Sequence, residues 1–342
     1  MTLPPLPGAT YCVFQRRRAG DFLLHVGLFN AIKDYDPTAR LTVVAGRRAQ
    51  AIAECHPAID RVLLFDASPV PLASLLSALL GQCFDVWIDP KDGFSRSSLL
   101  FGALARARIK VGINGPRFRP FNHPLAPPEP GTHLSRIALR PLAALGLDTP
   151  RLPRLTLGIP PASRARVATL YREAAPWTVL VNVSAGHAQR YWGYERWAAL
   201  ISRLAAVRPT TFFLSADPAD YSSSEAIALA LQSQGLDARL VPMGSLLDVA
   251  AVVERADVSL SADTAIVHLA SVLDRPIVGL YLAHRPTLEL FGPLSRVREI
   301  VVAEEREPMS SITVDRVEEA YARVVRGIDD ERSLGAASGL TA

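Results

Sequence analysis

Short apolar runs alternate along the chain with longer segments whose apolar positions recur every three or four residues. In the first half these runs predict strands, over residues 11–15, 41–45, 62–65, 86–88 and 110–113. The longer segments have helical spacing, over residues 21–35, 48–55, 70–80, 97–107 and 134–145. Strands that alternate with helices in this way indicate a parallel sheet covered by helices on both faces.

The alternation starts again in the second half, after residues 149–156, where two prolines favour an extended linker. The strands predicted there are residues 178–183, 210–214, 238–241, a run that ends before Asp263, and 277–281. The predicted helices are residues 163–174, 194–206, 223–234, 246–254, a short one from Thr264, and 312–328. We therefore expect two doubly wound, Rossmann-like α/β domains facing a cleft, residues 1–155 and 156–342. The final helix could pack back on the first domain.

Two segments lack this pattern. Residues 114–135 contain six prolines and two glycines and predict a long loop, of the kind that is often functional or mobile. Residues 333–342 are mostly small and are expected to be frayed.

Composition is that of a folded protein, with 49% apolar and 20% charged residues in a chain of 342. The first residues do not resemble a signal peptide, and no apolar run reaches the length of a membrane span. We expect a cytoplasmic protein, at most peripheral on the inner membrane. Cys12, Cys55 and Cys83 are too scattered for a disulfide framework or a zinc cluster, and their apolar neighbours predict buried thiols.

Charge is unevenly divided between the halves. Residues 1–150 hold 17 basic and 11 acidic side chains, whereas residues 151–342 hold 20 and 22. The excess suits an anionic partner for the first half, and a solvated arginine-rich surface explains it equally well.

Polar residues follow several predicted strands. Asp263 and Thr264 end a strand and begin a helix, where free N–H groups suit a phosphate; a helix cap is the plainer interpretation. Ser184, Ala185 and Gly186 would let a ligand approach the backbone, and Arg190 could reach a phosphate. An ordinary surface loop, in which Trp192 packs locally, fits the same residues.

Other strand ends are less specific. Gly20 and Asp21 open the first helix, so Asp21 is either a general base or a helix cap. Asp220 could bind a ribose and Met243 could cover a base, although turn and core residues look the same. His268 could face the ligand or lie in the core. The chain has no Walker loop, Gly-x-Gly-x-x-Gly, Gly-x-Ser-x-Gly or His-Glu-x-x-His motif, and no basic patch interleaved with aromatic residues that would favour nucleic acid.

Several separated blocks together resemble one family. They are Gly20-Asp21 with its apolar helix, residues 35–44, residues 56–62, residues 190–197 and, most specifically, residues 256–276. In these the chain is similar to the bacterial lipopolysaccharide heptosyltransferases, inverting glycosyltransferases of family 9 with the two-domain GT-B fold. The likeness extends over most of residues 10–330.

The resemblance implies that a heptose passes from ADP-heptose to an anionic lipopolysaccharide core acceptor, with no metal or separate cofactor. It places Asp21 as the general base, Arg190 near the donor diphosphate and Asp263 against the donor sugar. The backbone of Thr264 and Ala265 would hold the phosphates.

The remaining expected contacts divide between the two substrates. On the donor side they are Ser184, Ala185, Gly186, Asp220 at the ribose, Met243 at the adenine, and His268. On the acceptor side they are Gly20, Arg16, Arg17, Arg18, Arg117 and Arg119.

Four departures from the family pattern leave alternatives open. Arg190 stands where Lys is usual, Ala265 where Gly is usual, and Asp220 is shorter than the usual Glu. Residues 184–186 lack a hydroxyl pair that some members have. A different nucleotide sugar or acceptor, or a degenerate module that binds a nucleotide sugar without turnover, would also fit.

Overall fold

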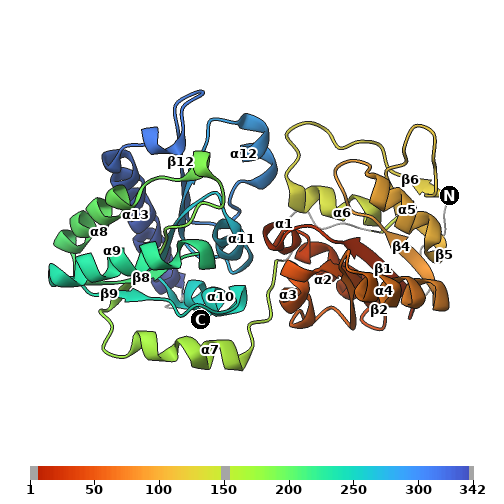
Figure 1. The fold of residues 1–342 in the computed structure, drawn as a ribbon, viewed down its shortest axis with the longest axis horizontal. Helices are drawn as coiled ribbons and strands as arrows, with labels where there is room; N and C mark the ends of the chain where they lie inside the picture. Colours follow the sequence, from red (N-terminus) through yellow and green to blue (C-terminus); the bar gives the residue numbers. More distant parts are fainter. Residues whose placement is uncertain (1–6, 148–154, 339–342) are drawn as a thin grey trace. The chain divides into compact units, whose positions relative to one another are not determined.

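The computed structural model describes residues 7–147 and 155–338 and divides into two compact units. The first unit comprises Met1–Gly158 with Glu289–Phe291, and the second comprises Ile159–Leu288 with Gly292–Ala342 (Figure 1). Most of the predicted linker, residues 149–154, lies outside the described residues. Each unit is an α/β structure with one parallel sheet of six strands, the doubly wound arrangement that the sequence predicts.

The sheet of the first unit has the strand order β3-β2-β1-β4-β5-β6. Its strands are β1 (Thr10–Gln15), β2 (Arg40–Gly46), β3 (Arg61–Phe65), β4 (Cys83–Ile88), β5 (Arg106–Gly112) and β6 (His123–Pro124). Its helices are α1 (Ala19–Leu23), α2 (Val26–Tyr35), α3 (Gln50–Glu54), α4 (Pro69–Gly81), α5 (Arg96–Leu104) and α6 (Leu134–Ala144). Chain order reverses between β1 and β4, which pair in parallel with Val13 beside Ile88. The loops that follow these two strands therefore meet at a topological switch point, where open α/β sheets bind ligands.

The proline-rich segment after β5 is held by one aromatic anchor. Phe121 is 3% exposed, and its ring fills the space where a Cβ on Gly102 or Gly112 would lie within 3 Å of it. Asn114 fixes the same turn, since its side chain accepts from the Phe121 N–H at 3.0 Å and donates to the Phe121 carbonyl at 2.8 Å. The predicted long loop thus has a packed centre and its own short strand, β6.

The sheet of the second unit has the order β12-β11-β10-β7-β8-β9. Its strands are β7 (Trp177–Asn182), β8 (Thr210–Ser215), β9 (Ala238–Leu240), β10 (Val258–Ala262), β11 (Ile277–Tyr281) and β12 (Arg298–Val302). Its helices are α7 (Pro161–Val167), α8 (Tyr194–Val207), α9 (Tyr221–Ser233), α10 (Leu246–Arg255), α11 (Ala265–Val272) and α13 (Val314–Ser338), while α12 (Arg285–Phe291) ends on residues assigned to the first unit. Here the chain order reverses between β7 and β10.

The final helix, α13, packs on its own unit. Its buried face joins the core of the second sheet through Val317, Tyr321 and Val324, and the Trp177 indole donates to the Tyr321 hydroxyl at 2.7 Å. These contacts bury the apolar side of the helix predicted over residues 312–328, for which the sequence does not decide the packing partner. The helix also continues to Ser338, so residues 333–338 of the segment expected to be frayed are helical. Arg332, which pairs with Asp257 at 3.1 Å, ties down this last part.

Several boundaries differ from the prediction for local reasons. The helix predicted over residues 21–35 is interrupted at Leu24 and His25, because the His25 ring donates to the Asp21 carbonyl at 2.7 Å and takes the place of a backbone N–H. The helix predicted to reach residue 107 ends at Leu104, and the alternating basic residues after it belong to β5. The elements β6, α12 and β12 were not predicted.

The prediction of three buried thiols was wrong. Cys12 is buried in the middle of β1, but Cys55 is half-buried and Cys83 is exposed. Cys83 is the first residue of β4, and the next residue, Phe84, is the one directed into the core.

Candidate active site

Three polar side chains join the strand ends at the switch point of the second unit. Asn182 ends β7 and lies beside Ser261 of β10 in the strand pairing. Its amide donates to the Ser261 hydroxyl at 3.1 Å, to the Thr264 hydroxyl at 3.2 Å and to the Ser184 carbonyl at 3.1 Å. Asn182 therefore fixes both loops that border the switch point. It was not among the residues singled out from the sequence, although a polar residue that ends the apolar run of residues 179–181 was a visible signal.

Thr264 caps α11, as the plainer interpretation of the sequence held. Its hydroxyl accepts from the Ile266 N–H at 3.3 Å. The N–H of Ala265, at the first helical position, has no partner within the helix, and the positive end of the helix dipole lies there. Ala265 is half-buried at the helix start. Capping and anion binding are compatible at this terminus, because they use different N–H groups.

Arg190 and Asp263 form an ion pair beside that helix start. One guanidinium nitrogen, Nη1, lies 3.0 Å from Asp263 Oδ2 and also donates to the Asp263 carbonyl at 3.0 Å. Asp263 is 7% exposed, whereas the Arg190 side chain is 38% exposed. The pair anchors one edge of the guanidinium, so its other nitrogens can meet a ligand. Tyr281, which the sequence did not indicate, is buried nearby: burial raises its pKa well above the ordinary value, and the charge of Asp263 adds to this effect.

The loop after β7, which contains Arg190, is bonded to the end of a neighbouring strand. Ser184 and Ala185 are buried, and the Ser184 hydroxyl accepts from the Asp217 N–H at 2.7 Å, which links the loop to the end of β8. Gly186 has φ of +64°, a left-handed conformation that L side chains rarely adopt. Trp192 packs edge-on against Trp197 with ring centroids 4.5 Å apart, so local packing and the small-residue turn coexist in this loop.

The other donor-side candidates lie farther along the same sheet edge. Asp220 follows β8 and is half-buried, and Met243 follows β9 and is 61% exposed, so Met243 is not a core residue. His268 is buried on α11. Adjacent strands lie about 4.8 Å apart, so the row from β10 through β7 and β8 to β9 spans about 14 Å.

In the first unit, Asp21 lies at the third position of α1 and does not cap it. The residue at the cap is Arg18, and no side chain bonds to this helix start. Asp21 is partly buried, with Arg17 Nη1 at 3.9 Å from its Oδ2. Burial raises the pKa of Asp21, the guanidinium of Arg17 lowers it, and the charge of Asp92 raises it again. A half-buried carboxylate whose pKa is raised is suited to accept a proton.

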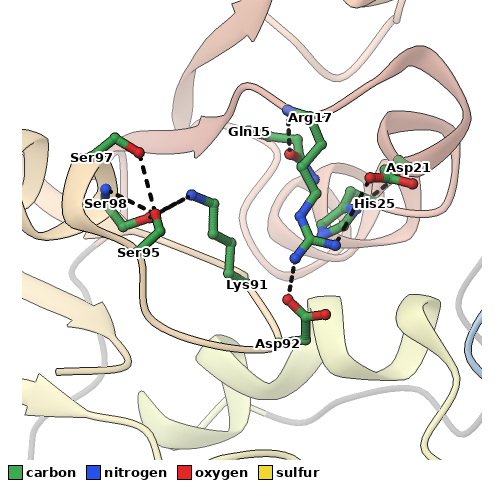
Figure 2. Close-up of polar contacts among 9 residues, drawn as sticks. All are labelled: Gln15, Arg17, Asp21, His25, Lys91, Asp92, Ser95, Ser97 and Ser98. Atoms are coloured by element: carbon green, nitrogen blue, oxygen red, sulfur yellow. Dashed lines mark hydrogen bonds and ion pairs between the residues drawn. The ribbon is translucent and has the colours of Figure 1, made fainter. Parts of the chain in front are cut away.

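The basic candidates of the first unit do not act as one patch. Arg16 and Arg17 line a cavity with Lys91, whereas Arg18, Arg117 and Arg119 are exposed and none of these three borders that cavity. Arg17 lies between Asp21 and Asp92 and contacts both (Figure 2). Gly20 is a half-buried residue of α1.

Lys91, Asp92 and His25 were missed by the sequence reasoning. Lys91 and Asp92 follow β4, and both line the same cavity as Arg17. His25 is buried beneath α1. Burial lowers its pKa to about 4, and the nearby charge of Arg17 acts in the same direction.

With the geometry in place, the comparisons with known proteins decide the family. The model of glycosyltransferase family 9 (heptosyltransferase) matches residues 72–322. This chain belongs to that family. It is therefore a glycosyltransferase, and the match covers all of the second-unit site and the loop after β4, although Asp21 lies before its first residue. A comparison with curated protein sequences gave no match.

Solved structures of family 9 proteins share the fold. A glycosyl transferase family 9 protein from Veillonella parvula superposes with a TM-score of 0.79 at 16% identity, covering 94% of this chain and 98% of that one. The E. coli heptosyltransferase WaaC with ADP gives 0.73 at 21% identity, covering 92% and 99%. The E. coli ADP-heptose lps heptosyltransferase II gives 0.75 at 16%, covering 93% and 99%. At these identities the likeness establishes the fold: the GT-B heptosyltransferase architecture predicted from the sequence is confirmed.

No three His, Cys, Asp or Glu side chains among the described residues gather in a group that could hold a metal ion. Within the same residues, no helix is both long enough and apolar enough to cross a membrane.

Proposed function

We propose that this family 9 glycosyltransferase moves a heptose, with inversion, from ADP-heptose to an acceptor of the lipopolysaccharide core. Membership of the heptosyltransferase family supports the sugar. The solved WaaC structures of similar fold hold ADP and ADP-2-deoxy-2-fluoro heptose, which supports the nucleotide.

The observation that carries the proposal is the Arg190–Asp263 pair at the start of α11. A leaving diphosphate needs positive charge and directed N–H groups. The free edge of the Arg190 guanidinium and the Ala265 N–H offer both at one switch point, and Asn182 holds the two loops in register. The ribose and base would extend along the sheet edge toward Asp220 and Met243. Asp263, which is paired with Arg190, would face the donor sugar.

In this proposal the groups named above have the following roles in the bond changes. The acceptor hydroxyl gives its proton to the Asp21 carboxylate as its oxygen attacks the anomeric carbon. The bond from that carbon to the diphosphate oxygen breaks, and ADP leaves with the bonding electrons. This scheme uses no cofactor, because the nucleotide sugar is a substrate. The raised pKa of Asp21 increases its strength as a base.

The test is transfer by the purified protein, with a panel of nucleotide sugars and a core acceptor. We expect ADP release and a glycosylated product from ADP-heptose, with inverted anomeric configuration by NMR. Asp21→Asn should lower kcat by roughly 10²- to 10⁴-fold. Arg190→Ala should lower it by roughly 10²- to 10³-fold, as for loss of one charge-stabilising donor.

Arg190→Lys is the matched control, because it keeps the cation and should keep most of the activity. Preference for another nucleotide sugar would reject ADP-heptose as the donor. Binding of ADP without turnover on any acceptor would reject catalysis and leave a nucleotide-sugar-binding module. Full activity in Asp21→Asn would remove Asp21 from the mechanism.

A further inference from the structure

A cavity of about 240 Å³ opens at the switch point of the first unit. Its walls are the loop after β1, with Arg16 and Arg17, and the loop after β4, with Lys91, Asp92 and Ser95. These two loops flank the place where the strand order reverses, the position at which sheets of this type bind ligands. We call this cavity the Lys91 pocket.

Two of the three cations in the Lys91 pocket have no carboxylate partner among the described residues. Arg17 is paired with Asp92. Arg16 instead donates through Nη2 to the Ser97 hydroxyl at 2.6 Å, and its buried Nε has no hydrogen-bond partner among the residues that the structure describes. The Lys91 ammonium donates to the hydroxyls of Ser95 and Ser98, as Figure 2 shows. Hydroxyl groups orient a cation without neutralising it, so the pocket keeps a positive charge.

Aromatic rings lie beside both of these cations. Lys91 is 7% exposed, with its ammonium 5.6 Å from the Phe14 ring centroid, and the Arg16 guanidinium lies 5.1 Å from that of Phe65. An aromatic floor keeps water away, so a ligand charge is poorly screened there. The buried acid Asp89 forms no ion pair with Lys91 within 4 Å. Burial raises the pKa of Asp89 and lowers the pKa of Lys91, and the attraction between the two charges opposes both shifts.

The pocket also adjoins the proposed base. Arg17 lines the pocket and lies 3.9 Å from Asp21. Ser95 caps α5, whose N-terminus begins at the pocket wall. A molecule anchored here by an anionic group would thus have neighbouring groups close to Asp21.

We propose that the Lys91 pocket binds one oxyanion of the acceptor, a carboxylate or a phosphate, and that Lys91 makes the enzyme specific for acceptors that carry it. This assignment rests on the proposed function for the identity of the ligand as the acceptor. The argument that the pocket binds an anion uses residues of the first unit alone. The ammonium and the Arg16 guanidinium hold the oxyanion, and Ser95 and Ser98 position the ammonium.

The first test needs no transferase activity. The chain contains only three lysines, Lys33, Lys91 and Lys110, so protein labelled with ¹³C at lysine Cε gives three NMR signals. Lys91→Arg removes one signal and assigns it. Glucuronate and glucose 6-phosphate are titrated at constant ionic strength, with glucose as the neutral probe. The anion that saturates the shift of the Lys91 signal at the lower concentration shows whether the pocket prefers a carboxylate or a phosphate.

We expect the Lys91 signal to shift saturably with at least one anion and not with glucose, while the other two signals stay in place. An unmoved Lys91 signal, or equal shifts of all three lysines, would overturn the proposal. Neither result depends on whether the donor is ADP-heptose, so failure of the pocket is distinguishable from failure of the proposed function.

The second test uses transfer to an anionic acceptor and to its neutral methyl ester. Lys91→Gln should raise KM for the anionic acceptor by roughly 10- to 100-fold, the worth of a hydrogen bond to a charged group, and leave KM for the ester unchanged. Lys91→Arg should restore much of the loss. Lys110→Gln is the control, since Lys110 lies on β5 and donates to the Gly102 carbonyl at 2.8 Å, outside the pocket. Equal effects of Lys91→Gln on both acceptors, in protein with wild-type Tm, would contradict a role in reading the charge.

Discussion

His25 makes the stability of the first unit depend on pH, and this can be tested without any substrate. The imidazole is fully buried beneath α1, and its Nδ1–H donates to the Asp21 carbonyl at 2.7 Å. Burial, aided by the charge of Arg17, lowers its pKa from 6.5 to about 4. The change to make is His25→Gln, which keeps an N–H donor of similar reach and removes the titration.

The size of the effect follows from the two pKa values. The unfolded chain takes up a proton near pH 6.5 and the folded chain only near pH 4, so acidification favours the unfolded state between these values. The stability that neutral His25 contributes is complete above pH 6.5 and is lost as the pH falls toward 4. One pKa unit corresponds to about 1.4 kcal/mol, so the loss is about 2 kcal/mol at pH 5 and about 3 kcal/mol at pH 4.

Urea unfolding at pH 7.5 and pH 5 measures this loss. The transition of the first unit can be followed through Trp87, the one tryptophan of that unit, by fluorine NMR of protein labelled with 5-fluorotryptophan. Wild-type protein should lose about 2 kcal/mol more than His25→Gln between the two pH values. The same pH dependence in both proteins, or an imidazole that titrates near pH 6.5 in the native state, would refute the reasoning.

Three further predictions concern the anchors of the fold and the site. Phe121→Ala should lower the free energy of unfolding in urea by about 3–5 kcal/mol, because it removes a buried ring and leaves a cavity. The half-exposed Phe118 is the control, and Phe118→Ala should change this free energy by less than about 0.5 kcal/mol. Similar losses in both variants would contradict the role of Phe121 as an anchor. Asn182→Ala should lower stability by about 1–3 kcal/mol and weaken ADP binding in calorimetry, because its amide joins the two loops of the second-unit switch point; unchanged affinity would separate it from the site. Arg17→Gln should move the acidic limb of kcat/KM to higher pH, because loss of the guanidinium raises the pKa of Asp21 further and the base works only when deprotonated; an unmoved limb would exclude Asp21 as the group that titrates.

Much of the fold could be predicted because its signals are local. The buried strands β1, β2, β7 and β8 are short apolar runs bordered by turns, and each lies within two residues of its predicted position. The polar residues that follow β7 and β10 stand out for the same reason, since a strand buried on both faces tolerates charge only at its ends. Where the signal was not local the prediction failed. Nothing in the sequence of residues 21–35 indicates that the His25 ring will donate to a backbone carbonyl and interrupt the helix.

What the sequence by itself determined is the identity of the parts: the strands and helices of two doubly wound units, the cap at Thr264, and the acids and arginines at strand ends. Only the tertiary structure decided which of these parts meet. Strand order sets the switch points, and strand order is a matter of long-range pairing that no short window of sequence encodes. It places Asn182 beside Ser261 and Thr264, some 80 positions away. By the same pairing, Lys91 joins Arg16 and Arg17 from across the chain, and a lysine that looks like any surface residue in the sequence becomes a buried cation in a pocket.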